Sequence, residues 1–244
     1  MAAYLLIHGA WHGAWCWDTL AASLRGAGHH VRAIDLPGMG EDHTPLKQVT
    51  MQAWTDRVVK ELAGFATPAV LVGHSMGGMV ITAAADAAPE CVSRLVYVCA
   101  FLPKDGESLV SLATRPEGAN ALLQQIPSAD GLSVSVTPQN ARLTFYGECS
   151  AAEAARAAAR LTPQPLQPAL APLKLRNAQA VRLPRVYIEC TQDRAIPIEL
   201  QRFMAKRAVG ARLESLPADH SPFLSMPERL LPLLQKDGEV YCSK

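Results

Sequence analysis

Ala69-Val-Leu-Val-Gly-His-Ser-Met-Gly-Gly78 is the stretch that decides the fold of this chain. Four apolar residues typical of a buried strand precede a Gly-x-Ser-x-Gly turn, and a run of small residues compatible with a helix follows it. A bare Gly-x-Ser-x-Gly match arises by chance in loops, so the strand before it and the helix after it carry the weight. Glycine is needed on both sides because a Cβ there would collide with the tight turn. The stretch predicts that Ser75 projects as a nucleophile from the top of a sheet.

Short apolar runs of strand character recur along the chain, separated by segments long enough for helices. They span residues 4–7, 31–34, 69–72, 95–99, 186–190 and 212–216. This alternation predicts an α/β fold, with a mostly parallel sheet of about six strands flanked by helices. Residues 54–65 and 77–88 are helix candidates, and Pro89 ends the second.

The alternation of strand and helix patterns stops between residues 103 and 183, where the sequence becomes rich in alanine, leucine and proline. A flexible linker is one interpretation of this composition. The segment has too much apolar surface for disorder, however; it is supplied by Leu122, Leu123, Ile126, Leu143, Phe145 and Tyr146. We predict a core made of residues 1–103 and 181–244, and a mostly helical cap insertion of residues 104–180 over the carboxyl edge of the sheet.

The composition fits one domain with a substantial core, because the 244 residues are 49% hydrophobic and only 18% charged. Lysine and arginine number 23 against 22 aspartates and glutamates, which gives a net charge of +1 and argues against nucleic acid as a partner. The first residues lack the charged start and the long apolar run of a signal peptide. No stretch reaches the ~18 apolar residues that a membrane-spanning helix requires. We expect a soluble, cytoplasmic protein with no membrane partner.

The six cysteines lie far apart and form no C-x-x-C pair. This spacing indicates neither a zinc site nor a disulfide framework. We expect most of them to be buried thiols that act as small apolar side chains; they are Cys16, Cys91, Cys99, Cys149, Cys190 and Cys242.

A serine hydroxyl needs a base, and the chain offers seven histidines. Six lie in the first loop, beside the second strand or within the serine turn itself. His220 instead follows the last predicted strand, where the chain order nucleophile, acid, histidine would place the base. Asp193 ends the loop after the preceding strand and is the predicted orienting acid. Its rivals are Glu189, within that strand, and Asp219, which we expect to shape its turn by bonding nearby backbone N–H groups.

Acyl transfer also needs two N–H donors for the oxygen that becomes negative. Met76, directly after the serine, is one predicted donor. Ala10 is the other, because the His8-Gly9 pair after the first strand lets the backbone turn toward the site. The same pair also fits an ordinary strand-ending turn. Trp11 is predicted to line the substrate pocket.

Several long motifs in the same order make the chain similar to the small α/β-hydrolases that include plant methylesterases and hydroxynitrile lyases. The motifs are Leu6-Ile-His-Gly-Ala-Trp-His-Gly-Ala-Trp15, Gly28-His-His-Val-Arg-Ala-Ile-Asp-Leu36, Val70-Leu-Val-Gly-His-Ser-Met-Gly-Gly-Met79, Cys190-Thr-Gln-Asp-Arg-Ala-Ile-Pro197 and Ala218-Asp-His220. The resemblance spans nearly the whole chain and implies an α/β-hydrolase fold with a site that needs no cofactor and no metal. It puts the family triad at Ser75, Asp193 and His220, and the oxyanion donors at Ala10 and Met76.

Two positions bear on the choice of chemistry within this family. The lyases look to need a lysine directly after the catalytic histidine to hold departing cyanide, and this chain has Ser221 there. They also carry a threonine in the first loop where Gly9 stands. Relatives with dehalogenase or epoxide-hydrolase chemistry use a carboxylate at the position of Ser75. The cap, rich in alanine and proline, departs most from the plant proteins, so no particular plant-hormone ester is predicted.

We therefore predict a serine carboxylesterase that hydrolyses esters of small to medium-sized organic acids through an acyl-enzyme on Ser75. Two alternatives stay open: a lyase that cleaves cyanohydrins, and a non-catalytic receptor for a small ligand on the same fold. The expected partner is a small-molecule ester. The sequence leaves the oligomeric state open, with a homodimer as one option.

Overall fold

The computed structural model describes residues 1–121, 123–208 and 210–236. Its centre is a six-stranded sheet with the strand order β2-β1-β3-β4-β8-β9, in which every neighbouring pair is parallel. The strands are β1 Ala3–Ile7, β2 His30–Ile34, β3 Ala69–His74, β4 Val92–Val98, β8 Arg185–Cys190 and β9 Ala211–Leu216. Each predicted apolar run overlaps one of these strands, so the predicted parallel sheet is confirmed.

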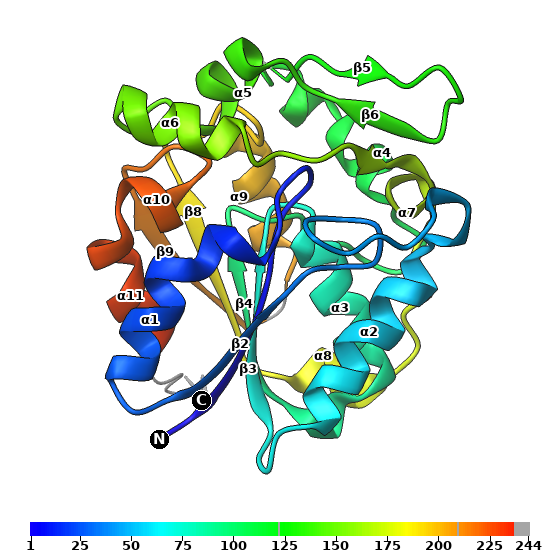
Figure 1. The fold of residues 1–244 in the computed structure, drawn as a ribbon. Coiled ribbons are helices and arrows are strands. Elements are labelled where there is room, and N and C mark those ends of the chain that lie inside the picture. The colour runs from blue at the N-terminus through cyan, green and yellow to red at the C-terminus, as the bar shows by residue number, and fades with distance from the viewer. Residues whose placement is uncertain (122, 209, 237–244) are drawn as a thin grey trace.

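Helices cover both faces of the sheet (Figure 1). The main ones are α1 Asp18–Gly26 and α11 Pro227–Gln235 on one face, and α2 Met51–Ala63, α3 Gly77–Ala87 and α9 Ile198–Lys206 on the other. Successive side chains of a strand point to opposite faces, so Leu5 packs with the α2 and α3 side and Leu6 with the α1 side. Burial on both faces explains why the strands are continuous apolar runs.

The two helices predicted at residues 54–65 and 77–88 are confirmed as α2 and α3. Thr50 begins α2, because its side chain accepts a hydrogen bond from Ala53 N. Shorter helical pieces connect the larger elements; they are α10 Pro222–Ser225 and the 3-10 turns Ala14–Trp17, Leu46–Gln48, Pro89–Cys91 and Pro116–Gly118.

Most of the segment between β4 and β8 lies over the carboxyl ends of the strands, at the top of Figure 1, while its last helix lies lower, beside α3. Its helices are α4 Leu109–Ala113, α5 Pro138–Phe145, α6 Ala151–Ala158, α7 Leu166–Leu170 and α8 Ala178–Arg182. The segment also holds a three-stranded antiparallel sheet of β5 Ile126–Pro127, β6 Ser133–Ser135 and β7 Gln164–Pro165. Strands of two or three residues are too short to show alternation, which is why the sequence predicts none here.

Three of the six apolar side chains expected to fold this segment pack into it, and Leu123 is one of them, partly buried. Phe145 and Tyr146 are buried in a cluster with Trp11, while Ile126 and Leu143 are exposed. Leu122 lies outside the described residues. The cap boundaries at residues 104 and 180 stay a prediction, and α8 runs across the second of them.

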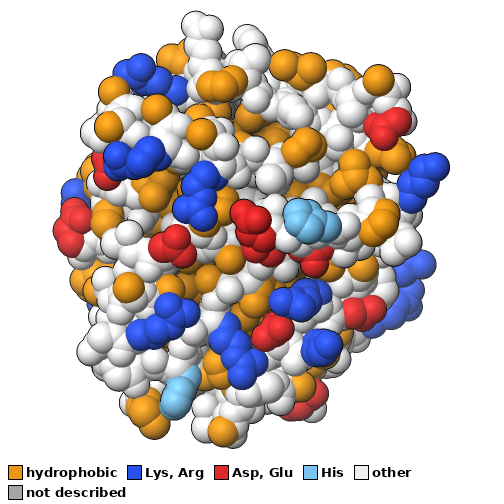
Figure 2. Space-filling view, viewed as in Figure 1, with side chains coloured by type: hydrophobic (Ala, Val, Ile, Leu, Met, Phe, Trp, Pro, Cys, Tyr) orange, Lys and Arg blue, Asp and Glu red, His pale blue; other side chains and the backbone are white. Residues whose placement is uncertain are grey.

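The surface carries charges of both signs. Figure 2 shows Lys and Arg side chains interspersed with Asp and Glu on the viewed face. A protein that follows a phosphate backbone needs a continuous basic strip, and this face has none. Within the described ranges, no helix combines the length and apolar character needed to cross a membrane.

The cysteines that the structure describes are free thiols. Cys16, Cys99 and Cys190 are buried, as expected of small apolar fillers, while Cys91 and Cys149 are half-buried. Burial raises the pKa of the Cys16 and Cys99 thiols well above its usual range, so both stay protonated. Cys242 lies outside the described residues.

Gly78→Ala is expected to destabilise the fold by about 2–3 kcal/mol, a fall of about 5–10 °C in Tm. A Cβ at Gly78 would overlap the carbonyl oxygen of Phe101 and lie 2.9 Å from Cβ of Ala100, so α3 would have to move away from the chain after β4. Gly26→Ala is the matched control, because nothing lies within 4 Å of a Cβ there. Thermal melts followed by circular dichroism measure both variants, and equal melting temperatures would contradict this close packing.

Candidate active site

Ser75 lies at the sharp turn between β3 and α3. Its φ is 52°, in the left-handed region that residues other than glycine adopt rarely. Neighbouring backbone holds the turn, because Ser75 N donates to Val98 O at 3.2 Å and Ser75 O accepts from Phe101 N at 3.0 Å. Glycine is required at Gly73, where a Cβ would lie 2.7 Å from the carbonyl oxygen of Gly77. Strain of this kind persists only where the surroundings maintain it and is characteristic of functional sites.

The structure brings together the three residues predicted to act with one another. Nε2 of His220 lies 2.9 Å from Oγ of Ser75, and Nδ1 lies 2.7 Å from Oδ2 of Asp193. A carboxylate accepts, so Nδ1 carries the proton and Nε2 is free to accept the serine proton. The side chains of His220 and Asp193 are almost fully buried, at 3% and 0% exposure. The arrangement can deprotonate the hydroxyl as it attacks an electrophile.

Asp193 is held in place by its own hydrogen bonds. Its Oδ1 accepts from the backbone N–H groups of Ala195 and Ile196, at 2.7 and 2.9 Å. Its Oδ2, which faces His220, also accepts from Nε2 of Gln201 at 3.2 Å. Gln201 is fully buried on α9 and was not singled out from the sequence, where a single glutamine in an amphipathic helix gives no signal.

The carboxylates of Glu189 and Asp219, the two other candidates for the orienting acid, bind groups other than the His220 ring. Glu189 pairs with Arg202, whose Nη2 lies 2.9 Å from Oε1. Asp219 accepts from Ser221 N at 3.1 Å and from Ser225 Oγ at 2.7 Å. Its second oxygen accepts from Glu148 N at 2.9 Å, which ties the segment over the sheet to the loop that carries His220. Asp219 therefore shapes its turn and anchors the segment over the sheet.

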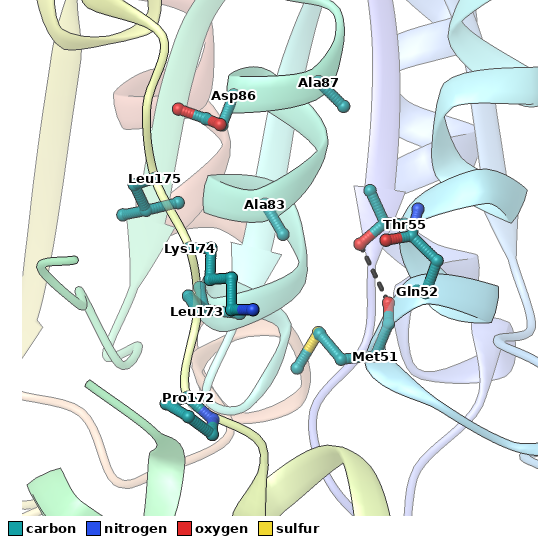
Figure 3. Close-up of a pocket in the computed structure, with 10 residues that line it drawn as sticks. All are labelled: Met51, Gln52, Thr55, Ala83, Asp86, Ala87, Pro172, Leu173, Lys174 and Leu175. Atoms are coloured by element: carbon teal, nitrogen blue, oxygen red, sulfur yellow. Dashed lines mark hydrogen bonds between the residues drawn. The ribbon is translucent and has the colours of Figure 1, made fainter. Parts of the chain in front are cut away.

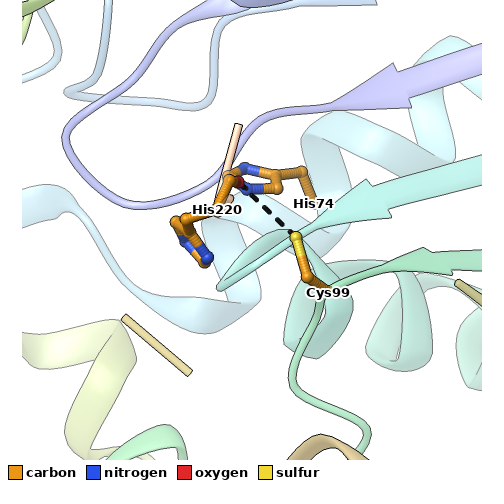
Figure 4. Close-up of side chains that lie close together, drawn as sticks. All are labelled: His74, Cys99 and His220. Carbon is orange, nitrogen blue, oxygen red and sulfur yellow. Dashed lines mark hydrogen bonds between the residues drawn. The ribbon is translucent and has the colours of Figure 1, made fainter. Parts of the chain in front are cut away.

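The backbone carbonyl of His220 is supported by two other buried side chains (Figure 4). Nε2 of His74 donates to it at 2.7 Å and Sγ of Cys99 at 3.5 Å. The ligand atoms of these three side chains lie within 4.8 Å of one another, and they are of the types that bind metals. Both ring nitrogens of His220 are engaged with Asp193 and Ser75. In this arrangement the cluster holds the imidazole in position.

Ala10 and Met76 both line the cavity in front of Ser75. Met76 directly precedes α3, at the N-terminal end of the helix, where the helix dipole favours negative charge. Among the residues that the structure describes, neither amide nitrogen has a hydrogen-bond partner. Two unpaired N–H groups beside one hydroxyl are what a tetrahedral oxyanion requires.

The cavity has a volume of about 200 Å³ and a mostly apolar lining. Trp11, which the sequence predicts to line the substrate pocket, is part of the lining of this cavity, together with Phe101 and Phe145. The lining residues that the structure describes include no lysine, arginine, aspartate or glutamate. Among the described residues, the lining consists of Ala10, Trp11, Ser75, Met76, Phe101, Leu109, Ala113, Gly118, Ala121, Leu123, Gln125, Phe145, Ala195, Ile196, Pro197, Leu200 and His220.

Comparison with known protein families decides where the chain belongs. A family described as the alpha/beta hydrolase family matches residues 4–233. The chain belongs to the alpha/beta hydrolase family. The match includes the sheet, the segment between β4 and β8 and all three residues of the hydrogen-bonded chain, so the resemblance seen in the sequence motifs is confirmed.

Relatives of this α/β-hydrolase are similar over nearly their whole length. The pyrethroid hydrolase of Sphingobium wenxiniae is 34% identical over 239 residues, which cover 93% of this chain and 84% of the relative. Methylesterase 7 of Arabidopsis thaliana is 29% identical over 252 residues, 98% of this chain and 96% of the relative. A crystal structure of a pyrethroid hydrolase from Sphingobium faniae matches with a TM-score of 0.85 at 30% identity, covering 96% of each chain. The similarity thus extends through the segment between β4 and β8.

A second cavity of this α/β-hydrolase, about 280 Å³, lies between α2, α3 and the chain at residues 172–175 (Figure 3). Asp86 is its acidic group, and its carboxylate already accepts hydrogen bonds from the backbone N–H groups of Arg176 and Asn177. Thr55 donates to the carbonyl of Met51 inside its own helix. Ser75, Asp193 and His220 do not line this cavity, so the apolar cavity beside Ser75 is the candidate active site.

Acid is expected to destabilise this α/β-hydrolase through its buried histidines. Burial lowers the pKa of His12 to about 3, and it also lowers the pKa of His8 and His74. Below about pH 6.5 these histidines are protonated in the unfolded chain but stay neutral in the folded chain. Their contribution to the free energy of unfolding is therefore fully present above that pH and is lost as the pH falls toward 3. Burial raises the pKa of Asp219, which works in the opposite direction.

Each such histidine should remove about 1.4 kcal/mol of unfolding free energy per pH unit. Urea denaturation at pH 7 and pH 5 measures the difference, and His12→Asn should give a flatter dependence. An unfolding free energy that is the same at both pH values would contradict the neutral, buried state of these rings.

Proposed function

We propose that Ser75 is the nucleophile of a carboxylic ester hydrolase, with His220 as its base, Asp193 as the orienting acid, and the N–H groups of Ala10 and Met76 as the oxyanion hole. One observation carries the proposal: an unbroken chain of hydrogen bonds runs from Asp193 through His220 to Ser75, which opens on an apolar cavity. The relatives named as esterase and hydrolase support carboxylic ester hydrolysis as the activity of this protein.

The first half of the reaction forms an acyl-enzyme. Oγ of Ser75 attacks the ester carbonyl carbon while its proton passes to Nε2 of His220, 2.9 Å away. The carbonyl oxygen becomes negative and accepts from the N–H groups of Ala10 and Met76. When the intermediate collapses, the alkoxide takes the proton from Nε2 and leaves as the alcohol, and the acyl group stays on Ser75.

The second half repeats these steps with water. Nε2 of His220 accepts a proton from water as the water oxygen attacks the acyl carbon. The oxyanion hole again holds the negative oxygen. Collapse returns the proton to Oγ of Ser75 and releases the carboxylic acid. Asp193 stays ionised throughout and stabilises the imidazolium that forms in each half.

The shape and polarity of the cavity favour uncharged esters of small to medium-sized acids. A volume of about 200 Å³ limits the size of the groups flanking the ester, and an uncharged lining gives no compensation for burying a charged substituent. Phe101, Leu200 and Ile196 provide apolar contacts. The lyase alternative is not favoured, because the relatives are esterases and hydrolases and Ser221, not lysine, follows His220.

A fluorophosphonate probe tests the proposal directly. Mass spectrometry of the treated protein should show one adduct, on the peptide that contains Ser75, together with loss of p-nitrophenyl ester hydrolysis. A series of p-nitrophenyl esters of increasing acyl length should lose turnover beyond medium chains. Cyanide release from mandelonitrile without ester turnover would replace the proposal with the lyase, and tight binding of a small apolar ligand without turnover would replace it with the receptor.

Three further predictions from the sequence remain proposals. We infer that residues 104–180 act as a cap that encloses the substrate, which is consistent with Leu109, Leu123 and Phe145 lining the cavity. We also retain a cytoplasmic location and a homodimer. Fractionation of cells and the mass measured by light scattering test these two.

A further inference from the structure

Two histidines of the first loop hold the backbone on either side of Ala10. Nδ1 of His8 lies 2.8 Å from the carbonyl oxygen of Gly9, and Nδ1 of His12 lies 2.8 Å from the carbonyl oxygen of Ala10. The first carbonyl belongs to the peptide that carries the N–H of Ala10, and the second belongs to the next peptide. A carbonyl oxygen only accepts, so both Nδ1 atoms carry a proton. The orientation of the Ala10 N–H is therefore set by two imidazole donors.

The far nitrogen of each ring has a partner that fixes this tautomer. Leu36 N donates to Nε2 of His8 at 3.1 Å, from the chain directly after β2. The hydroxyl of Tyr146 lies 2.8 Å from Nε2 of His12. Because burial keeps the His12 ring neutral, with its pKa lowered to about 3, and its proton is on Nδ1, the hydroxyl donates. One histidine is thus fixed by the core and the other by the segment over the sheet.

The same segment holds Trp11, the residue after Ala10. Trp11 N donates to Oε1 of Gln164 at 3.3 Å, and Trp11 O accepts from Thr162 N at 2.9 Å. The indole Nε1 donates to Val134 O at 2.9 Å. The φ of Trp11 is 60°, a strained value for a bulky residue that neighbouring contacts must maintain. The peptide between Ala10 and Trp11 is therefore held at both its oxygen and its nitrogen.

We propose that the segment over the sheet orients the oxyanion hole, and that Tyr146, acting through His12, is a positioning residue for the N–H of Ala10. The inference rests on the proposed ester hydrolysis and goes beyond it, because it gives this segment a part in stabilising the transition state. A donor contributes fully only when it is already aimed at the oxygen as charge develops. A displacement of about 1 Å can lower a rate by about 10²-fold.

Tyr146→Phe is the first test. Loss of the hydroxyl leaves Nε2 of His12 without its hydrogen-bond donor, so the ring loses the contact that fixes its orientation and the hydrogen bond from Nδ1 to Ala10 O weakens. We expect kcat, counted per fluorophosphonate-titrated site, to fall about 10-fold with little change in KM, because the hole contributes more to the transition state than to the substrate complex. The inhibition constant of phenylboronic acid, which forms a tetrahedral anion on serine, should rise by a similar factor.

Tyr187→Phe is the matched control, since Tyr187 is also fully buried and its hydroxyl donates to Ala100 O at 2.7 Å. A similar loss of Tm with unchanged kcat is expected for this control. If Tyr146→Phe behaved in the same way, the tyrosine would be packing only and the inference would be overturned.

The second test uses His12→Asn. The Asn amide nitrogen takes the place of Nδ1 and donates to Ala10 O without a partner from Tyr146, so this variant should keep kcat within about 5-fold of wild type, whereas His12→Leu should lose more than 10-fold. Adding Tyr146→Phe to His12→Asn should then change kcat by less than about 2-fold. Equal, independent losses from Tyr146→Phe in both backgrounds would contradict a pathway through His12.

The variants distinguish a failure of the proposed ester hydrolysis from a failure of the proposed role of Tyr146. If Ser75→Ala retained full turnover, the proposed hydrolysis would fail and the inference with it. If Ser75→Ala was inactive while Tyr146→Phe kept the wild-type kcat and the wild-type affinity for phenylboronic acid, only the inference would fail. If Tyr146→Phe lowered kcat in the wild-type protein but not in the His12→Asn variant, both the hydrolysis and the role of Tyr146 would be supported.

Discussion

Ser75→Ala is expected to lower kcat for p-nitrophenyl acetate by about 10⁴-fold or more. The change removes the atom that forms the acyl-enzyme, while the oxyanion hole and cavity remain to provide the residual rate. Folding should be preserved, because the replaced hydroxyl contacts His220 and the turn is held by backbone hydrogen bonds to Val98 and Phe101. Initial rates measured with purified protein, with Tm as the check on folding, give the result.

Ser23→Ala is the matched control, since it also removes a serine hydroxyl but on the exposed side of α1, where Oγ donates only to Thr19 O. It should keep full turnover. A Ser75→Ala protein with wild-type kcat would show that the hydrogen-bonded chain from Asp193 to Ser75 is not the source of the activity.

Asp193→Asn is expected to lower kcat by about 10³- to 10⁴-fold with a small change in KM. The amide can turn its N–H₂ toward His220 in place of the carboxylate, and the ring would then carry its proton on Nε2 and could not accept from Ser75. The two backbone N–H groups of Ala195 and Ile196 hold the other oxygen of residue 193, so they favour this orientation in the variant. The positive charge that forms on the ring would also lose its partner.

Asp219→Asn discriminates between the two carboxylates near the base. Asp219 accepts from Ser221, Ser225 and Glu148 and makes no hydrogen bond to the His220 ring among the described residues. We expect its variant to lose stability, through weaker anchoring of the segment over the sheet, and to lose less than about 10-fold in kcat. Turnover by Asp193→Asn at the wild-type rate, with Asp219→Asn inactive, would reverse the assignment of the orienting acid.

The sheet and the triad candidates could be predicted from the sequence because each produces a local sequence pattern. A strand buried on both faces is a short apolar run, and a serine turn between strand and helix needs glycine at fixed positions such as Gly73. His220 and Asp193 were found by their place after strands, since parallel strands bring the loops at their carboxyl ends to one edge. These signals need a few neighbouring residues only.

The residues that position the site from a distance give no such local sequence pattern. Tyr146 and His12 are 134 residues apart, and nothing in the sequence around either one predicts the contact. Gln201 lies on a helix whose spacing predicts burial but not a bond to Asp193. The two-residue strands of the segment over the sheet are likewise set by pairing with Ser133–Ser135 and not by their own side chains.

The amino-acid sequence alone determined the α/β class, the order of the strands along the chain and the residue types available for acyl transfer, because these depend on hydrophobic period and on glycine at tight turns. Only the tertiary structure decided which imidazole nitrogen faces which oxygen, which carboxylate meets His220, and that Tyr146 reaches the loop of Ala10. Hydrogen-bond geometry between distant segments depends on how helices and strands pack in three dimensions, and that packing is a property of the whole chain.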